Sequence, residues 1–338
     1  MDHQLHEKHQ ERQHIWGLPR IDIQPFSEIS EHRDVALIYS AAALDAVTDR
    51  IRPEPSSRCE VLEATEEHFR SLSDDVAGEV IYAVGGGVAV DAAKYVGKLT
   101  GLPVVSLPTA MTVDAFFTWA AGVREDECVK YVETGPPERV VIDLDVLASA
   151  PESLRAAGIC DLLSIATGSW DWRFARDKGK LTDETSYQEW ADRVASSILE
   201  AAIDCAEAAG RGDPEGLKQL VDCLALEVQL CNQIGHSRPE EGSEHYFAYS
   251  VEHRVSQTLP HGDLVGPGIL IAAHLQEQDV SPLKQALVDC NVPIDHIPHA
   301  SVLETLEQLP SYSEFHSLPF GIAHVAETPP PGILEILS

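Results

Sequence analysis

Short apolar segments alternate with segments of helical periodicity through the first 150 residues, and this alternation constrains the fold more than any other feature. The apolar segments have the length of strands and lie at 34–40, 58–64, 79–87, 103–109 and 139–147. The segments of helical spacing lie between them, at 41–51, 66–76 and 91–101. Strands that are apolar along their whole length and separated by helices belong to parallel sheets covered on both faces. The sequence therefore predicts an α/β fold in this half, with ligands bound beyond the carboxyl ends of the strands.

The second half of the chain has a different pattern. Long segments rich in Ala, Leu and Glu, at 185–210 and 216–235, have helical spacing. We therefore expect an α/β domain over residues 1–150 and a helical domain over residues 151–338. Prolines recur from Asn291 onward, which predicts only short helices in the tail.

The composition limits the partners of the protein. There are 55 Asp and Glu against 24 Lys and Arg, which gives a formal net charge of −31. This charge argues against nucleic acid and anionic membrane surfaces as partners, because both require clustered Lys and Arg. The acids are spread along the chain, which is typical of a solvated acidic surface, and a salt-tolerant source is the alternative interpretation. There is no stretch of 18 apolar residues, so we expect no membrane insertion.

The cysteines and the N-terminus indicate a compartment. Seven cysteines are scattered without a paired spacing, which favours a reducing environment, and the N-terminal segment has no apolar core. We therefore expect a cytoplasmic protein. The N-terminal segment carries His3, His6, His9 and His14, which indicate a loosely packed arm or an adventitious metal site.

A glycine-rich turn is the candidate nucleotide site. Gly85, Gly86 and Gly87 stand between a predicted strand and a predicted helix, where backbone amides and the helix dipole favour a phosphate group. A tight turn with no ligand is the alternative. The next strand ends near Thr109, and the polar loop after it carries hydroxyl and carboxyl groups that could hold a nicotinamide ribose or substrate, or cap a helix; these are Thr112, Asp114 and Thr118.

Three residues further along the chain form a candidate metal site. Asp161 follows Gly158 at the expected start of a helix, His245 lies on a probable helix, and His261 stands between a proline and a glycine. One carboxylate and two imidazoles with an open position suit a catalytic zinc or iron that polarises a substrate hydroxyl, and zinc does so without redox chemistry. Helix capping by Asp161 and structural histidines are the alternatives. His253 and His274 are weaker candidates.

Several motifs occur in a fixed order between residues 80 and 275: GGGxxxDxAK, PTAxTxD, APxxLxAAGxxDLLS, GSEH and HGxxVGxG. This order resembles the glycerol-1-phosphate dehydrogenase family, within the group that contains iron-dependent alcohol dehydrogenases, glycerol dehydrogenase and dehydroquinate synthase. The separation of His245 and His261 fits the spacing of that family. The resemblance implies a Rossmann-like N-terminal domain, an all-helical C-terminal domain, and a cleft between them for NAD(P) and a divalent metal.

The resemblance also implies residue roles. The residues expected along the dinucleotide phosphates are Gly85, Gly86, Gly87, Val88, Ala89, Val90 and Asp91, and those nearer the nicotinamide are Thr109, Thr112 and Thr118. Asp161, His245 and His261 would hold the metal. The residues expected to meet substrate are Asp114, Asp161 and Tyr249, and the first two are the expected catalytic residues.

The chain departs from the family pattern at three positions. Val113 stands where the family tends to have histidine, Ile165 where it tends to have lysine, and Tyr249 where it commonly has a histidine four residues after the ligand. The first two bear on phosphate recognition, and the third puts a phenol where an imidazole would hold a polar group. A different or unphosphorylated polyol therefore becomes plausible as substrate.

We expect an NAD(P)-linked oxidoreductase acting on a hydroxyl of a small polyol or polyol phosphate. Glu60 and Glu63 follow the second strand while Arg58 lies close by, which favours NAD weakly over NADP. A homo-oligomer is the default expectation. The alternatives are a dehydroquinate-synthase-like cyclase that retains NAD, and a family member without catalytic activity.

Overall fold

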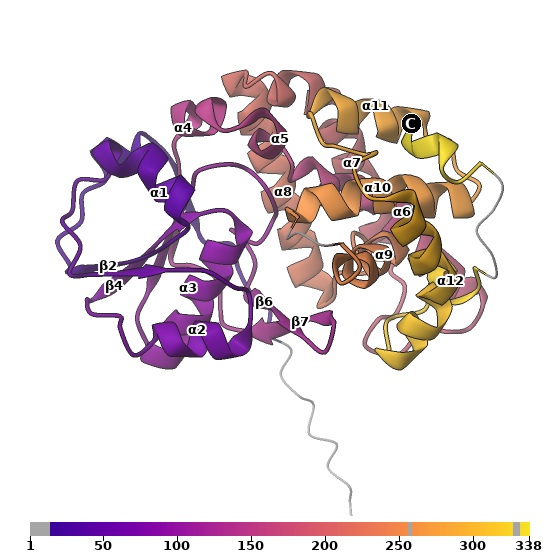
Figure 1. Cartoon of the computed structure of the whole chain (residues 1–338), viewed down its shortest axis with the longest axis horizontal. Coiled ribbons are helices and arrows are strands. Elements are labelled where there is room, and N and C mark those ends of the chain that lie inside the picture. The colour runs from indigo at the N-terminus through magenta and orange to yellow at the C-terminus, as the bar shows by residue number, and fades with distance from the viewer. Residues whose placement is uncertain (1–13, 256–258, 327–331) are drawn as a thin grey trace, which may run out of the picture.

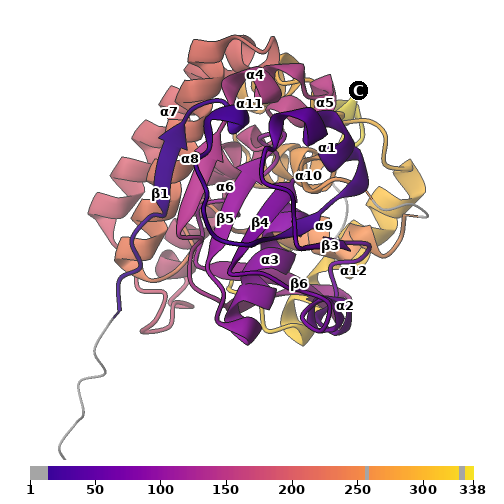
Figure 2. The ribbon, with the colours of Figure 1, turned by 90° about the vertical axis from the view of Figure 1, so that its left-hand side faces the viewer.

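The computed structural model describes residues 14–255, 259–326 and 332–338, and its N-terminal half is built on a six-stranded sheet (Figures 1 and 2). The strand order is β1-β8-β5-β4-β2-β3, and every neighbouring pair is parallel. The strands are β1 (Arg20–Ile23), β2 (Val35–Tyr39), β3 (Ser57–Glu60), β4 (Val80–Gly85), β5 (Val104–Pro108) and β8 (Arg139–Ile142). The predicted α/β class is confirmed. Of the N-terminal histidines, His3, His6 and His9 lie outside the described residues.

The uniformly apolar strands bury both faces. Along β4, Val80 and Tyr82 pack in one hydrophobic cluster with α1 (Ala41–Val47), whereas Ile81 and Ala83 pack in another with α3 (Gly87–Thr100). Successive side chains of a strand point to opposite faces, so a strand covered on both sides has no polar alternation. A third helix, α2 (Glu66–Leu72), contacts α3.

The sheet order creates a crevice beside β2. This strand pairs with β3 on one side and with β4 on the other, so successive connections lead in opposite directions from it. Ligands of open α/β sheets bind at such a switch point, beyond the carboxyl ends of the strands. Here those ends are followed by Ser40 and by the glycine turn at Gly85.

A hairpin of β6 (Ala120–Glu125) and β7 (Cys128–Glu133) projects from the sheet domain and was not predicted. Its two-residue loop, Asp126 and Glu127, has φ of 51° and 58°. Two positive φ values are the signature of a type I′ turn, but Asn-Gly usually supplies them. The Asp126–Glu127 pair is therefore a weak sequence signal for a hairpin turn. The hairpin depends instead on packing of β6 against α3.

Beyond β8 the described residues form helices joined by loops, with no further strand (Figure 1). These helices are α4 (Leu144–Ser149), α5 (Glu152–Arg155), α6 (Ile159–Asp177), α7 (Glu189–Gly210), α8 (Pro214–Ile234), α9 (Ser243–Glu252), α10 (His261–Leu275), α11 (Ser281–Asp289) and α12 (His299–Phe315). Short 3-10 turns complete the chain: η1 (Phe26–Glu28), η2 (Thr48–Arg50), η3 (Ile322–His324) and η4 (Glu335–Leu337). None of the helices seen in the described ranges combines the length and apolar character needed to cross a bilayer.

Two expectations about secondary structure were wrong. The predicted strand at 139–147 ends at Ile142, and α4 follows because Asp143 caps it by accepting the amides of Asp145 and Val146. The tail beyond Asn291 contains a 17-residue helix, α12, which includes Pro310. Pro298 stands at the N-cap of α12, where a proline is tolerated, and the helix continues through Pro310 although this residue has no backbone amide to donate, so the prolines did not limit its length.

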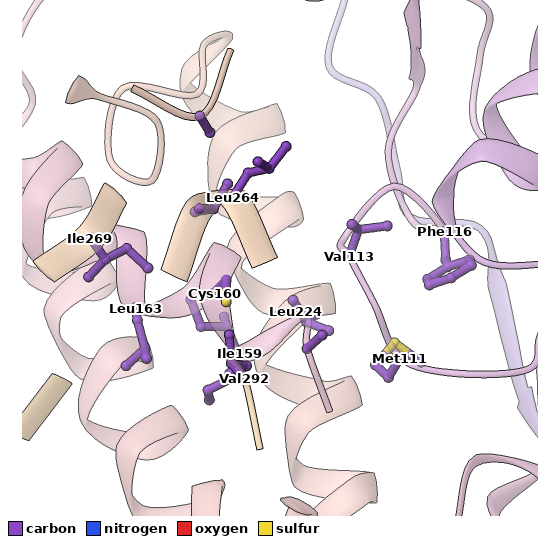
Figure 3. Close-up of a cluster of buried hydrophobic side chains, with 14 of the residues drawn as sticks. Met111, Val113, Phe116, Ile159, Cys160, Leu163, Leu224, Leu264, Ile269 and Val292 are labelled. Carbon is purple, nitrogen blue, oxygen red and sulfur yellow. The ribbon is translucent and has the colours of Figure 1, made fainter. Parts of the chain in front are cut away.

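Backbone hydrogen bonds join the two halves. The amide of Met111, in the loop after β5, donates to the carbonyl of Arg155 at 3.2 Å, and the amide of Gly158 donates to the carbonyl of Met111 at 2.8 Å. Figure 3 shows Met111 and Val113 on one side of this junction and Leu224 on the other. One hydrophobic cluster contains all three side chains, so the core is continuous between the halves.

We predict that Asp143→Ala lowers the free energy of unfolding by about 2 kcal/mol. The buried carboxylate caps α4 and also accepts the amide of Phe26 at 2.9 Å, so its removal leaves donors unsatisfied at two places. Urea unfolding followed by circular dichroism measures the loss. Asp145→Asn, at an exposed position of the same helix, is the control and should cost under about 1 kcal/mol; equal effects of the two changes would contradict the capping role.

Candidate metal and nucleotide site

A single cleft contains both the glycine turn and the candidate metal ligands. It has a volume of about 1010 Å³ and lies between the carboxyl ends of β2 and β4 and the helices α6, α8, α9 and α10. The switch point of the sheet therefore opens directly onto the helical half. A ligand bound at one end of this cleft can reach the other.

The glycine turn is shaped by close packing. Gly85 has a φ of 149°, a conformation that side chains rarely adopt, and α3 begins two residues later. A Cβ atom on Gly87 would lie 2.8 Å from a methyl group of Val113, and one on Gly86 would lie 3.1 Å from the hydroxyl of Thr112. The glycines thus allow the loop after β5 to lie against the start of α3. The free amides and positive dipole end of that helix face the cleft at Gly86, Gly87 and Val88.

The structure divides the predicted cofactor residues into two groups. Six of them line the cleft: Gly86, Gly87, Val88, Asp91, Thr112 and Thr118. Four do not: Gly85, Ala89, Val90 and Thr109. The side chains of Ala89 and Val90 are buried among apolar groups because they lie on the inner face of α3. Any contact of these two with a nucleotide would have to come from the backbone.

A buried lysine, Lys94, stabilises the side of the cleft formed by α3 and the loop after β5, and the sequence analysis assigned it no role. The Lys94 ammonium lies 3.1 Å from the Asp91 carboxylate and donates to the Thr118 hydroxyl and to the carbonyls of Ala115 and Ala120. Asp91 and Lys94 are three residues apart on α3, a spacing that places both on one face and was the available signal. Asp91 and Thr118 therefore support the wall through Lys94 as well as lining the cleft.

The three predicted metal ligands come together. Asp161, His245 and His261 each offer a ligand atom, and these atoms lie within 4.8 Å of one another. The Nε2 atom of His261 lies 3.2 Å from Oδ1 of Asp161, and the two imidazole rings are 5.3 Å apart between centroids. Asp161 and His245 are buried, whereas His261 is partly exposed to the cleft.

A neighbouring carboxylate orients His245. Its Nδ1 lies 3.0 Å from Oε1 of Glu244, which leaves Nε2 directed away from that partner. Burial lowers the pKa of His245, but the hydrogen bond and charge of Glu244 more than offset this and raise it to about 9. A carboxylate that holds the second nitrogen of a histidine is the usual support of a metal ligand.

Close packing of α9 against α10 brings His245 and His261 together, although they are sixteen positions apart in the sequence. A Cβ atom on Gly268 would lie 2.5 Å from the carbonyl oxygen of Glu244, so α10 approaches the backbone of α9 there. Gly262 similarly approaches Ala157 beside the start of α6. The glycines of the HGxxVGxG motif therefore set the distance between the helices that carry the three ligands.

Asp114 joins the nucleotide loop to the metal ligands. Its backbone amide donates to Oδ2 of Asp161 at 2.8 Å, and the residue lines the cleft. Burial raises the pKa of the Asp114 carboxyl to about 8, and the nearby Asp161 carboxylate adds to the rise. A divalent cation beside Asp161 would oppose this effect, because it favours the charged carboxylate.

Tyr249 faces acidic partners. Its hydroxyl donates to Oε1 of Glu241 at 2.7 Å and lies 3.0 Å from the hydroxyl of Tyr131, while its ring is 6.0 Å from that of His245. Tyr249 therefore lies beside the candidate metal ligand His245, and its contact with substrate stays a prediction. The acidic partner and the tyrosine of the unpredicted hairpin were not anticipated.

A second group of potential ligands lies on the same cleft. Glu227, Cys231 and Glu240 bring their side-chain atoms within 4.8 Å of one another. Sequence reasoning missed this group, although Glu227 and Cys231 are four residues apart on a predicted helix and must share a face. The weaker histidine candidates take no part in either group, and His253 lines the cleft from the end of α9.

Comparison with known proteins agrees with this architecture. The sequence profile of the iron-containing alcohol dehydrogenase family matches residues 26–151. The chain is 31% identical over 232 residues to a glycerol-1-phosphate dehydrogenase [NAD(P)+] from Methanothermobacter thermautotrophicus, covering 68% of this chain and 66% of that protein. The match to the enzyme of the same name from Hyperthermus butylicus is 31% over 242 residues, covering 70% and 67%. The chain thus spans about two thirds of the length of these relatives.

A solved structure shares the fold over nearly the whole chain. The probable glycerol dehydrogenase from Sinorhizobium meliloti superposes with a TM-score of 0.68 at 17% identity, covering 95% of this chain and 96% of that one. Sequence and fold lead to the same group of proteins. The chain belongs to the glycerol-1-phosphate dehydrogenase family, a family of NAD(P)-linked enzymes among the iron-containing alcohol dehydrogenases.

Proposed function

We propose that this protein is a metal-dependent, NAD(P)-linked dehydrogenase that oxidises a hydroxyl of a small polyol or polyol phosphate, or reduces the matching carbonyl. In the oxidative direction the alcohol loses a hydride to the nicotinamide and a proton to the protein or solvent, which gives the carbonyl compound and NAD(P)H. The observation that carries this proposal is the position of the glycine turn and of the ligands Asp161, His245 and His261 on one cleft.

The donor set fits a divalent metal. One carboxylate and two imidazoles converge, and Glu244 supports His245 in the manner of a metal ligand's partner. Such an ion, when bound, supplies a Lewis acid that polarises the substrate hydroxyl. Zinc suits this role better than iron, because it adds no redox chemistry.

The remaining roles follow from the walls of the cleft. Asp114 lies beside Asp161 and is placed to take up the substrate proton. The amides at Gly86, Gly87 and Val88 face the position of the dinucleotide phosphates, and Thr112 and Thr118 lie on the same wall nearer the nicotinamide. Glu63, just after β3, also lines the cleft, and an acid there favours the free ribose hydroxyl of NAD over the phosphate of NADP.

We also infer the organisation and setting of the protein. The proposed boundary between residues 150 and 151 falls between α4 and α5, shortly after the sheet ends at Ile142, and α4 links the two domains because it follows the last strand and contacts α8. A reducing, cytoplasmic compartment is supported by seven free cysteines, most of them buried. A homo-oligomer is the expected state, which size-exclusion chromatography with light scattering measures.

Metal and cofactor chemistry are tested together. We expect about one zinc or iron per chain by mass spectrometry, and absorbance of NADH after addition of NAD with glycerol, glycerol 1-phosphate or an amino-polyol. Removal of the ion with a chelator should abolish NADH formation, and readdition of zinc should restore it. Metal-free protein with undiminished turnover would contradict the proposal. A product formed without net NADH would favour the cyclase.

The metal assignment predicts distinct effects for two histidines. His261→Ala should remove the bound ion and lower kcat/KM by at least about a thousandfold, while the affinity for NAD changes little. His253→Ala is the matched control, since His253 lines the same cleft without belonging to the ligand group. Metal content and steady-state kinetics measure both. Equal metal loss in the two variants would refute the ligand set.

The nucleotide assignment predicts an effect of charge at the start of α3. Val88 is 38% exposed there, so a longer side chain can be accommodated. Val88→Glu should weaken NAD binding roughly tenfold or more, because a carboxylate repels the pyrophosphate where the helix dipole attracts it. Val88→Gln, of equal size and no charge, should weaken binding only a few fold. Titration calorimetry compares them, and identical affinities would place the phosphates elsewhere.

A further inference from the structure

The cleft is lined by far more acids than bases. Eight carboxyl side chains face it, whereas Arg124 is the one arginine or lysine among the described residues that line it. The Arg124 guanidinium is already occupied by Glu252, at 3.3 Å. The nucleotide phosphates can use the backbone amides at the start of α3, but a phosphate group on the substrate would find no unpaired arginine or lysine among the described residues that line the cleft.

Two of these acids, Glu227 and Glu240, lie with Cys231 in a group whose side-chain ligand atoms are within 4.8 Å of one another, which we call the acidic wall. Glu227 and Cys231 lie one turn apart on α8, and Glu240 lies in the segment before α9. Both carboxyl groups are at least nine-tenths buried, with exposed fractions of 1% for Glu227 and 9% for Glu240. Burial, together with the charge of neighbouring carboxylates, raises the pKa of each well above its usual range. In the absence of a cation the raised pKa favours the protonated form of each carboxyl group, and a bound cation would favour the carboxylate instead.

The wall also has unsatisfied polar atoms. Oε2 of Glu227 has no hydrogen-bond partner, although its other oxygen accepts the thiol of Cys231 at 3.2 Å. The side-chain amide nitrogen of Asn232, which lines the same cleft, is also buried without a partner. A ligand that satisfies both must carry a donor for the carboxylate and an acceptor for the amide.

The acidic wall adjoins the metal ligands. Glu240 is followed by Glu241, which accepts the hydroxyl of Tyr249, and the Tyr249 ring packs beside that of His245. One small molecule can therefore place a hydroxyl at Asp161, His245 and His261 and a second group at the wall.

We propose that the acidic wall binds the ammonium group of the substrate, so that the enzyme acts on an amino-polyol in preference to a polyol phosphate. An ammonium supplies three donors and a positive charge to Glu227 and Glu240, and hydroxyls of the same molecule supply the acceptor for Asn232. A second metal ion is the other cation that this group could hold, because each of its three residues offers a ligand atom, and the test below distinguishes it from an ammonium. This inference rests on the proposed dehydrogenase activity.

The test compares three probes of similar size on zinc-loaded protein with NAD: 3-amino-1,2-propanediol, glycerol and glycerol 1-phosphate. We expect kcat/KM to be roughly tenfold or more higher for the amine than for glycerol, and lowest for the phosphate. Glu227→Gln should bring the ratio of amine to glycerol close to one. Glu200→Gln, at an exposed position of α7, should leave the ratio unchanged.

Binding supplies a readout that does not depend on turnover. Calorimetry with zinc-loaded protein and NADH should show that Glu227→Gln weakens 3-amino-1,2-propanediol at least about tenfold, with unfolding midpoints confirming that the variant is folded. Preference for glycerol 1-phosphate would overturn the inference and leave the dehydrogenase intact. If 3-amino-1,2-propanediol binds only when Glu227 is present, but no probe yields NADH, the ammonium site would be supported and the proposed dehydrogenase activity would be refuted. A second zinc per chain that is lost in Glu227→Gln would identify a metal site instead.

Discussion

The contact between the loop after β5 and the start of α6 is the constraint on which the site depends. Three hydrogen bonds make it: Met111 to Arg155, Gly158 to Met111, and the Asp114 amide to the Asp161 carboxylate. Met111 also packs in the core that continues into the helical half (Figure 3). The same loop lies against the glycine turn through Thr112 and Val113. Nucleotide wall and metal ligands are therefore held at a fixed separation, as hydride transfer requires.

Buried charge is the second feature that defines the site. The carboxyl groups of Asp161, Glu227, Glu240 and Glu244 are all buried, whereas the buried Lys94 is paired with Asp91 and Thr118 on the nucleotide wall. Carboxylates in such surroundings are costly unless a cation or a set of donors joins them. At Asp161 the histidines and a metal ion would supply the compensation. At the acidic wall the one side-chain donor to Glu227 among the described residues is the thiol of Cys231, so a cationic part of the substrate is the proposed partner.

The departures from the family pattern acquire a physical meaning in this setting. Val113 contributes a methyl group to the contact with Gly87, so its position is structural here. Ile165 is buried in the core of the helical half. Tyr249 is joined to Glu241 and Tyr131, so the phenol anchors an acidic surface. None of these side chains offers a positive charge to a phosphate.

The sequence by itself predicted the α/β class, the succession of β2, β3, β4, β5 and β8 along the chain, and the three candidate ligands Asp161, His245 and His261 that the structure brings within 4.8 Å of one another. Strands that are apolar along their whole length indicate a sheet buried on both faces. GSEH and HGxxVGxG are short motifs, so their glycines and histidines can be recognised from adjacent residues alone. Local signals were too weak for β1, for the hairpin with its Asp126–Glu127 turn, and for the extent of α12. The tertiary structure alone decided which predicted residues face the cleft, as Val88 does and Val90 does not. It alone also joined Glu227 of α8 to Glu240, because the energy of a charge depends on neighbours in space that the sequence order does not reveal.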